Sequence, residues 1–171
     1  DSTISQSFNM ASVTSTGKYV GGIAGTNSGS VVISCYNRGK ITGELRVAGI
    51  VGNCVGDISS CYNAAAVESN AATEGLIGAI AAFYYTAKIT DCYYDSILFT
   101  GKEDNGIPME SEEMKRHAFV SAINSAAGNF YYDYLNKNNG YPIMSWQADQ
   151  NLWDGTVSAP KLSSDNKLQY L

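Results

Sequence analysis

Short runs in which apolar and polar residues alternate recur along the first half of the chain. Residues 47–51 (Val-Ala-Gly-Ile-Val) and 57–62 (Asp-Ile-Ser-Ser-Cys-Tyr) are typical, because they are rich in β-branched and aromatic residues and have Gly, Asn or Ser at their ends. Such alternation predicts strands with one buried face, and no helical period fits the same runs. The sequence therefore predicts a mainly β structure, with about three short strands in each repeating stretch.

Two motifs repeat in step along this region. The first is a Gly-apolar-x-Gly tetrad that begins at Gly22, Gly49 and Gly75, in steps of 27 and 26 residues. The second is Cys-Tyr-Asn, which occurs at 35–37 and 61–63 and, in altered form, at 7–9 and 92–94. Two motifs that share one period are the signature of a repeat array.

A unit of this length cannot bury its own apolar face, whereas stacked units bury a continuous core. We therefore predict a parallel β-solenoid of about three to four coils with a C-terminal helical and aromatic cap. In it, Ile23, Ile50 and Leu76 form one interior row and the cysteines form another. Glycine would allow tight corners and close approach of coils. An antiparallel sandwich is the alternative, but it gives no reason for a fixed period.

The tetrad Gly75-Leu76-Ile77-Gly78 and the Cys-Tyr-Asn corners resemble the GLUG motif repeats of secreted and surface-anchored bacterial proteins. These include adhesin-like proteins and regions of immunoglobulin A metallopeptidases. The resemblance covers about residues 5–95, and 139–147 is similar to the segment that commonly closes such arrays. It implies a repeat architecture and an extracellular location, either secreted or attached to the cell surface.

We divide the chain into the repeat array, 1–95, a connecting loop and C-terminal cap, 96–147, and a linker-like tail or the start of a next module, 148–171. An apolar stripe with helical spacing follows Ser111 and predicts a helix near 111–127. Because the open end of a solenoid must be covered, this helix and the aromatic segments 130–134 and 141–146 are predicted to form the cap.

Composition argues against several functions. Charged residues make up 16% of the chain, the formal net charge is −5 and no run of Lys or Arg occurs, so we expect no nucleic-acid partner. No apolar stretch reaches about 18 residues, so we expect no membrane insertion. The chain lacks a signal peptide and begins inside a degenerate coil. This indicates a piece of a longer protein, whose other domains are its partners.

We expect the four cysteines to be buried free thiols rather than disulfides. Cys35, Cys61 and Cys92 occupy equivalent positions, and side chains in one row point the same way, which disfavours the torsion of a disulfide. Cys54 lies outside that row. The sequence has no Cys-x-x-Cys motif and a single histidine, His117, so we predict no metal and no cofactor.

No catalytic constellation is visible, so we predict that this segment is not an enzyme. The motifs H-E-x-x-H and G-x-S-x-G are missing. Asp57, Asp91 and Asp95 fall near the Cys-Tyr-Asn corners, where paired carboxylates could act as general acid and base or bind calcium. Because Asp91 aligns with Ser34 and Ser60, an ordinary polar corner position is the favoured interpretation.

Tyrosines are the better candidates for a binding site. Those at 36, 62 and 93 repeat at one position and are expected to stack within the structure. Four others break the repeat and are our candidate ligand-binding residues: Tyr84, Tyr85, Tyr131 and Tyr132. The first two belong to surplus residues that we place around 79–88, and the last two belong to the cap. Exposed tyrosines offer planar faces to sugar rings or to proteins.

The sequence thus predicts a noncatalytic extracellular adhesive or stalk module of a larger bacterial surface protein. Its expected partner is a host or cell-surface glycan or protein. The first alternative is an accessory region of a secreted peptidase or glycosidase, and the second is a carbohydrate-active β-helix enzyme.

Overall fold

The computed structural model describes residues 2–70, 75–101, 105–125 and 128–148, together with the backbone of β21 (Lys161–Leu162) and β22 (Leu168–Gln169), which pair antiparallel. Most of the predicted tail, 148–171, therefore lies outside the described residues. The chain divides into two compact units, Asp1–Ser111 and Glu112–Leu171.

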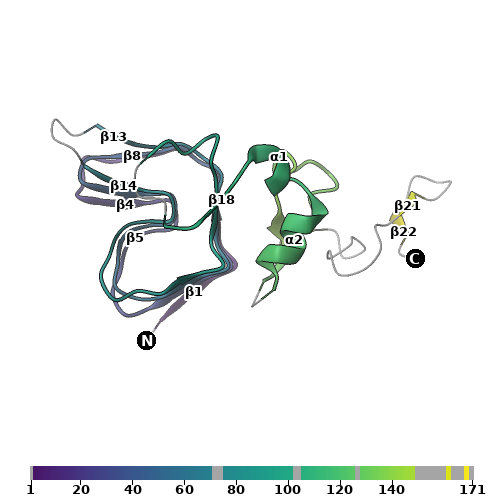
Figure 1. The fold of residues 1–171 in the computed structure, drawn as a ribbon, viewed down its shortest axis with the longest axis horizontal. Coiled ribbons are helices and arrows are strands. Elements are labelled where there is room, and N and C mark those ends of the chain that lie inside the picture. Colours follow the sequence, from purple (N-terminus) through teal and green to yellow (C-terminus); the bar gives the residue numbers. More distant parts are fainter. Residues whose placement is uncertain are drawn as a thin grey trace. The chain divides into compact units, whose positions relative to one another are not determined.

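The first unit is a parallel β-solenoid with five strands in each coil, seen along the stack in Figure 1. The first coil contains β1 (Thr3–Ser5), β2 (Phe8–Asn9), β3 (Val13–Thr14), β4 (Tyr19–Gly21) and β5 (Ala24–Asn27). The second contains β6 (Val31–Ile33), β7 (Tyr36–Asn37), β8 (Ile41–Gly43), β9 (Arg46–Ala48) and β10 (Val51–Cys54). The third contains β11 (Ile58–Ser59), β12 (Tyr62–Asn63), β13 (Val67–Ser69), β14 (Leu76–Gly78) and β15 (Ala81–Tyr84). The remaining strands are β16 (Ile89–Thr90), β17 (Tyr93–Asp95) and β18 (Ile107–Met109).

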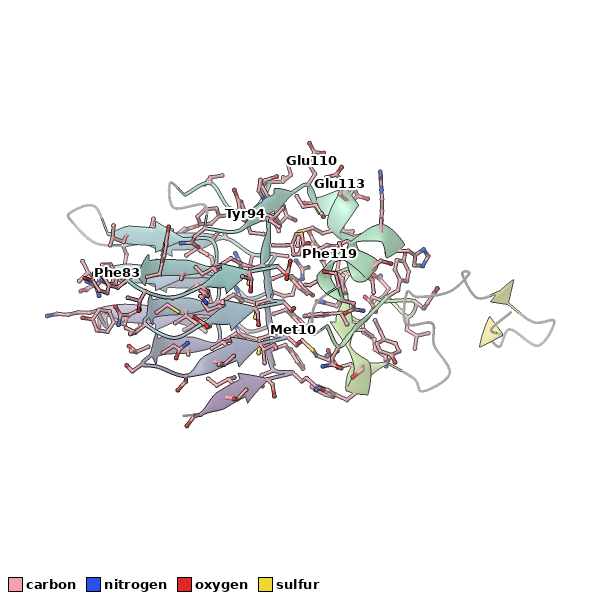
Figure 2. All side chains as sticks on the ribbon, turned by 60° about the horizontal axis from the view of Figure 1, so that its bottom comes forward. Met10, Phe83, Tyr94, Glu110, Glu113 and Phe119 are labelled. Atoms are coloured by element: carbon pink, nitrogen blue, oxygen red, sulfur yellow. The ribbon has the colours of Figure 1, made fainter. Side chains whose placement is uncertain are left out.

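Each strand pairs in parallel with its counterpart in the next coil, so that five sheets run along the solenoid. Their orders are β1-β6-β11-β16, β2-β7-β12-β17-β18, β3-β8-β13, β4-β9-β14 and β5-β10-β15. Figure 2 shows the coils as stacked layers. The predicted fold, a mainly β parallel solenoid, is confirmed. The coil has more strands than predicted because many strands span only two or three residues, too few for an alternation to be visible.

An aliphatic core runs through the coils. One of its rows consists of Ile23, Ile50 and Ile80, since Ile23 N donates to Ile50 O over 3.0 Å and Ile50 N donates to Ile80 O over 3.1 Å. Ile50 and Ile80 are fully buried. The predicted interior row is therefore correct for Ile23 and Ile50, but its third member is Ile80 and not Leu76.

Leu76 lies outside the core, so its predicted place in the interior row is wrong. It pairs with Arg46 and is 39% exposed. The cause is the connection that precedes β14. Residues 70–75 join β13 to β14, whereas only residues 44–45 join β8 to β9. The surplus of the third coil lies mainly in this connection and not around 79–88, and it moves the tetrad that begins at Gly75 out of register.

The side chains of the Cys-Tyr-Asn motif form continuous rows. Rings of Phe8, Tyr36 and Tyr62 stack with centroids 5.0 Å apart at each step and interplanar angles of 10° and 2°. Tyr93 continues the row in register opposite Tyr62. The predicted stack is confirmed, and because Tyr36 and Tyr62 are fully buried, this row belongs to the structure and not to a ligand surface.

A ladder of asparagine amides belongs to the same motif. Asn9 Nδ2 donates to Asn37 Oδ1 and Asn37 Nδ2 donates to Asn63 Oδ1, both over 2.8 Å. Asn37 Nδ2 also donates to Gly39 O over 2.8 Å. Tyr94 pairs with Asn63 in the next coil, and the ladder ends there. A shift of register would leave buried amides unpaired, so the ladder fixes how the coils stack.

All four cysteines are buried free thiols. Cys35 and Cys61 lie in one row, where Cys35 N donates to Cys61 Sγ over 3.4 Å. Cys54 donates its thiol proton to Gly56 O over 2.8 Å, and burial raises its pKa to about 11. Burial also raises the pKa of Cys61. Cys54 and Cys61 therefore remain protonated at neutral pH and pack as small apolar groups.

Residues that follow β17 close the C-terminal end of the solenoid core. Phe99 is 4% exposed, joins the core cluster and packs edge-on against Tyr94, with ring centroids 5.4 Å apart. β18 then extends one sheet by a further strand. The segment predicted as a connecting loop thus supplies part of the end cap. The cap assigned to the helix and aromatic segments of 111–147 stays a prediction.

Asn105 takes the place of the backbone of a further coil. Within the stack, Ile80 O accepts hydrogen bonds from Ile50 N and Val51 N over 3.1 and 3.0 Å. At the end of the stack, Asn105 Oδ1 accepts from Ile80 N and Ala81 N over 3.1 and 2.8 Å. Asn105 Nδ2 donates to Ala81 O. One side-chain amide thus pairs backbone groups that the last coil would otherwise leave without partners.

The second unit has a broken helix instead of the continuous helix predicted near 111–127. α1 (Ser111–Met114) begins at the last residue of the first unit, and α2 (His117–Ile123) follows. Arg116 between them is extended, with φ −94° and ψ 155°, and therefore interrupts the helix. Buried side chains of the apolar stripe are Met114, Phe119, Val120 and Ile123.

A two-stranded sheet completes the described part of the second unit. β19 (Phe130–Tyr131) pairs antiparallel with β20 (Ile143–Met144), and the short helix η1 (Ser145–Gln147) follows. The connection between the strands is ordered by the buried Asp133. Its carboxylate accepts hydrogen bonds from the backbone N–H groups of Lys137, Asn138 and Gly140 at 2.8, 2.6 and 3.1 Å.

Candidate functional site

Tyr84 and Tyr85 lie where the stacking of coils stops. Tyr84 ends β15, the last strand of its sheet, and pairs with Cys54 of the coil below. The two tyrosines are 44% and 81% exposed. The fully buried Cys54 has a coil on both sides, whereas Tyr84 has one on a single side. Val55, the residue of the second coil that corresponds to Tyr85, is 43% exposed, so the position of Tyr85 is exposed within the stack as well. The predicted projecting insertion at this place is wrong, although the predicted exposure of both rings is confirmed.

A second aromatic group lies on the lateral surface of the solenoid. The guanidinium carbon of Arg46 is 3.8 Å from the ring centroid of Phe83 and 5.2 Å from that of Tyr19. Arg46 Nη1 also donates a hydrogen bond to Asn53 Oδ1. We call Tyr19, Arg46, Asn53 and Phe83 the Arg46 cluster. Figure 2 shows Phe83 at the outer edge of the stacked coils.

The register of the sheets builds this cluster from three coils. Tyr19 and Arg46 are paired in the sheet of β4 and β9, and Asn53 and Phe83 are paired in the sheet of β10 and β15. Strands β9 and β10 approach closely because Gly52 has no side chain, and a Cβ there would lie 2.8 Å from Arg46 O. Sequence analysis missed the cluster, since these residues share no motif and meet only when the register is known.

Arg46 carries a half-buried positive charge. No carboxylate of the described residues forms an ion pair with it, whereas Lys40 pairs with Glu68 at 2.8 Å. Among the described residues, its charge is in contact with the faces of two aromatic rings and with one amide oxygen. A guanidinium in this setting retains donors for an anion, because it has five N–H groups in a planar fork.

The candidate residues Tyr131 and Tyr132 belong to the second unit. Tyr132 packs its ring 3.9 Å from that of His117 and 4.7 Å from that of Tyr134, measured between centroids. The Tyr134 hydroxyl and His117 Nε2 are 3.2 Å apart, within hydrogen-bond distance. Burial lowers the pKa of His117. Tyr131 and Tyr132 are half-buried, so they offer less open ring surface than Tyr84 and Tyr85.

The three candidate carboxylates have separate structural roles. Asp91 has φ 49° and stands at the same left-handed corner as Ser34 and Ser60, with φ 50° and 47°, so the interpretation as a polar corner is confirmed. Asp95 is fully buried and accepts hydrogen bonds from Ser111 Oγ at 2.7 Å and from two backbone N–H groups of the following turn. Asp57 Oδ1 accepts a hydrogen bond from Lys88 N over 3.0 Å.

Across the described ranges, no group of three or more His, Cys, Asp or Glu side chains is placed to hold a metal ion. None of the helices in the part of the chain that the structure describes has the length and apolar character needed to cross a membrane.

The fold and its side-chain rows define a class, the parallel β-solenoids built from repeated coils. No family model and no solved structure matches the chain. A putative Gly-rich membrane protein of Evansella cellulosilytica is 29% identical over 154 residues, an alignment that covers 81% of this chain and 17% of that protein. The chain thus spans about a sixth of the length of the relative that it matches.

Proposed function

We propose that this chain is a noncatalytic adhesive or stalk module of a larger bacterial surface protein, and that it binds a glycan or a host protein through exposed tyrosine rings. The observation that carries this proposal is the position of Tyr84 and Tyr85. Both rings lie open at the last coil of a rigid scaffold, and a planar ring held on such a scaffold binds at low entropic cost.

The similarity to a segment of a long glycine-rich protein supports a modular role. That relative is described as a membrane protein, which fits a location outside the cell, secreted or attached to its surface. The resemblance to the GLUG motif repeats points the same way. The local structural roles of Asp57, Asp91 and Asp95 favour a binding module over a carbohydrate-active enzyme, because acid–base hydrolysis of a glycosidic bond needs two carboxylates that are available to flank that bond.

The test compares the parent protein with a Tyr84→Ala, Tyr85→Ala double variant on a glycan array and on bacterial and mammalian cells. We expect the double variant to bind at least about tenfold more weakly, since each stacked ring contributes about 1 kcal/mol. A matched control is Trp146→Ala, which removes an exposed aromatic side chain from the second unit. Melting temperatures establish that all variants remain folded.

Three outcomes would overturn the proposal. A parent that binds neither glycans nor cells lacks an adhesive function, and a double variant that binds like the parent places the site elsewhere, with Tyr131 and Tyr132 as the next candidates. Release of reducing ends from a polysaccharide would instead indicate that the chain is a carbohydrate-active enzyme. A hydrolase or peptidase domain in the adjoining sequence would favour the accessory role.

A further inference from the structure

We propose that the Arg46 cluster binds the carboxylate of an acidic sugar, so that the glycan recognised by this module is an acidic oligosaccharide. This inference rests on the proposed glycan-binding function and specifies its ligand. It concerns a surface made of Tyr19, Arg46, Asn53 and Phe83, in which Phe83 directly precedes Tyr84 in β15.

Three side chains of the cluster have hydrogen-bond donors without a partner among the described residues. Arg46 donates through Nη1 to Asn53 Oδ1, and its other N–H groups have no hydrogen-bond partner among the described residues. The amide nitrogen of Asn53 and the hydroxyl of Tyr19 likewise have none within that part of the chain. A planar carboxylate matches the guanidinium fork with two parallel hydrogen bonds, and a neighbouring amide can donate to a sugar hydroxyl.

The scaffold holds the guanidinium ready for such a ligand. Arg46 begins β9, its guanidinium carbon lies over the rings of Tyr19 and Phe83, and its Nη1 donates a hydrogen bond to Asn53. A side chain held in this way loses little conformational freedom on binding, which is the main cost that a long arginine side chain would otherwise incur. The positive charge lacks a carboxylate partner among the described residues, so the carboxylate of a bound sugar would not compete with an ion pair formed by them.

Exposed apolar surface beside Arg46 favours a sugar over a simple anion. Tyr19 is 44% exposed, and Leu76, which pairs with Arg46 on the other side, is 39% exposed. A pyranose ring has a C–H face that can lie on these side chains while its carboxylate reaches the guanidinium. Because the net charge of the chain is −5, binding must come from this local contact and not from long-range attraction, so we expect weak binding.

The experiment titrates the parent protein with four probes in calorimetry or by nuclear magnetic resonance. Trigalacturonate and its methyl ester form one pair, and sialyllactose and its methyl ester form the other. The members of each pair differ only in the charge of their carboxyl groups, and comparing the pairs distinguishes a uronic acid from a sialic acid as the source of the carboxylate. A glutamate hexapeptide provides the carboxylates without a sugar. The variants are Arg46→Lys, which keeps the charge but loses the planar guanidinium fork, and the control Lys40→Met, which removes a positive charge that is paired with Glu68.

We expect at least one acidic probe to bind about tenfold more tightly than its neutral counterpart, and Arg46→Lys to lose about tenfold because lysine cannot bind bidentately. Lys40→Met should change the affinity by less than about twofold, as expected for an exposed charge outside the site. Equal binding of acidic and neutral probes, equal binding by Arg46→Lys, or stronger binding of the glutamate peptide would overturn the inference.

Failure of this inference and failure of the proposed function give different results. If neutral glycans bind and the Tyr84→Ala, Tyr85→Ala variant loses them, the module binds sugars without using Arg46. If no probe binds and the glycan array is also blank, both proposals fail. A loss of binding by Arg46→Lys supports the inference only when the melting temperature of the variant matches that of the parent. Arg46→Gln, which keeps a planar amide but has no charge, then tests whether the charge is needed for binding.

Discussion

Two corners of the same coil differ in the contacts that join them to the neighbouring coils. The asparagine corner, residues 34–37 and their equivalents, carries a tyrosine stack and an amide ladder with direct contacts from coil to coil. The glycine corner, residues 49–52 and their equivalents, makes its contacts through the backbone, with Ile50 N donating to Ile80 O. The first corner requires particular aromatic and polar side chains in register, whereas the second requires the absence of a side chain at position 49 beside an apolar side chain at position 50.

That difference explains why the glycine corner changes in the last coil. A Cβ on Gly22 would lie 2.3 Å from Gly49 O, and a Cβ on Gly49 would lie 2.3 Å from Ala79 O and from Asn63 Cγ. Both glycines are therefore required by the coil stacked above them. The third-coil counterpart is Ala79, a residue that does have a Cβ, and the next residue, Ile80, is followed by Asn105 instead of another coil. The glycine thus disappears where the stacking stops.

The largest expected effect concerns the interior row at the glycine corner. Ile50→Asp places a charge at a fully buried position in the middle of the stack and should destabilise the protein by about 4 kcal/mol or more. The matched control is Leu76→Asp, at the half-exposed position opposite Arg46, where we expect a change within about 0.5 kcal/mol. Chemical denaturation measures both. Similar losses for the two variants would refute the revised row.

The asparagine corner should be nearly as sensitive. Asn37→Ala removes hydrogen bonds to Asn9, Asn63 and Gly39, and the buried Asn63 Oδ1 loses the donor that it has in the ladder. We expect a loss of about 3 kcal/mol. Asn9→Ala, at the partly buried end of the ladder, should cost about 1 kcal/mol. If the two variants lose the same stability in urea, the ladder does not act as a connected row.

These two corners also mark how far the sequence alone could predict the structure. The rows of cysteine and tyrosine were predicted because the motif that contains them repeats at a fixed spacing, whereas the asparagine ladder in the same motif was found only in the structure. The tetrad that begins at Gly75 was misleading, because the longer connection before β14 places it out of register with the tetrads at Gly22 and Gly49. Residues 79–82 are their structural counterpart in the third coil, and they contain no glycine. The long stretch between Cys61 and Cys92 indicated that the third coil contains extra residues but did not show where in the coil they lie.

The candidate site was predictable only in part, for a related reason. Tyr84 and Tyr85 break the repeat and could be singled out by eye, whereas Arg46 meets Phe83 only through a register that spans 37 residues of chain. Asn105 gave no signal at all, because an asparagine beside a glycine is typical of a turn. Its role as a substitute for a carbonyl becomes visible only when the last coil is in place.

The glycine corner can be tested with a pair of opposite substitutions. Gly49→Ala should destabilise the protein by about 2 kcal/mol, because the new methyl group meets Ala79 O and the side chain of Asn63. Ala79→Gly, at the equivalent position in the last coil, should cost about 1 kcal/mol or less, from chain entropy alone. Thermal unfolding distinguishes the two. An equal cost at both positions would mean that stacking does not dictate the choice of glycine.

The smallest expected effect concerns the end of the stack. Asn105→Ala removes the acceptor of Ile80 N and Ala81 N and should cost about 1 to 2 kcal/mol, the penalty for leaving partly buried backbone donors unpaired. Asn105→Asp retains the acceptor oxygen and loses only the donor to Ala81 O, so it should recover part of that stability at neutral pH.

Hydrogen exchange at Ile80 and Ala81 should quicken in Asn105→Ala. Exchange at Ile50 should be much less affected, because Ile50 N keeps its partner in Ile80 O. Unchanged protection of Ile80 and Ala81 would show that another group closes the solenoid, and the helix and aromatic segments of 111–147 would then be the first place to look.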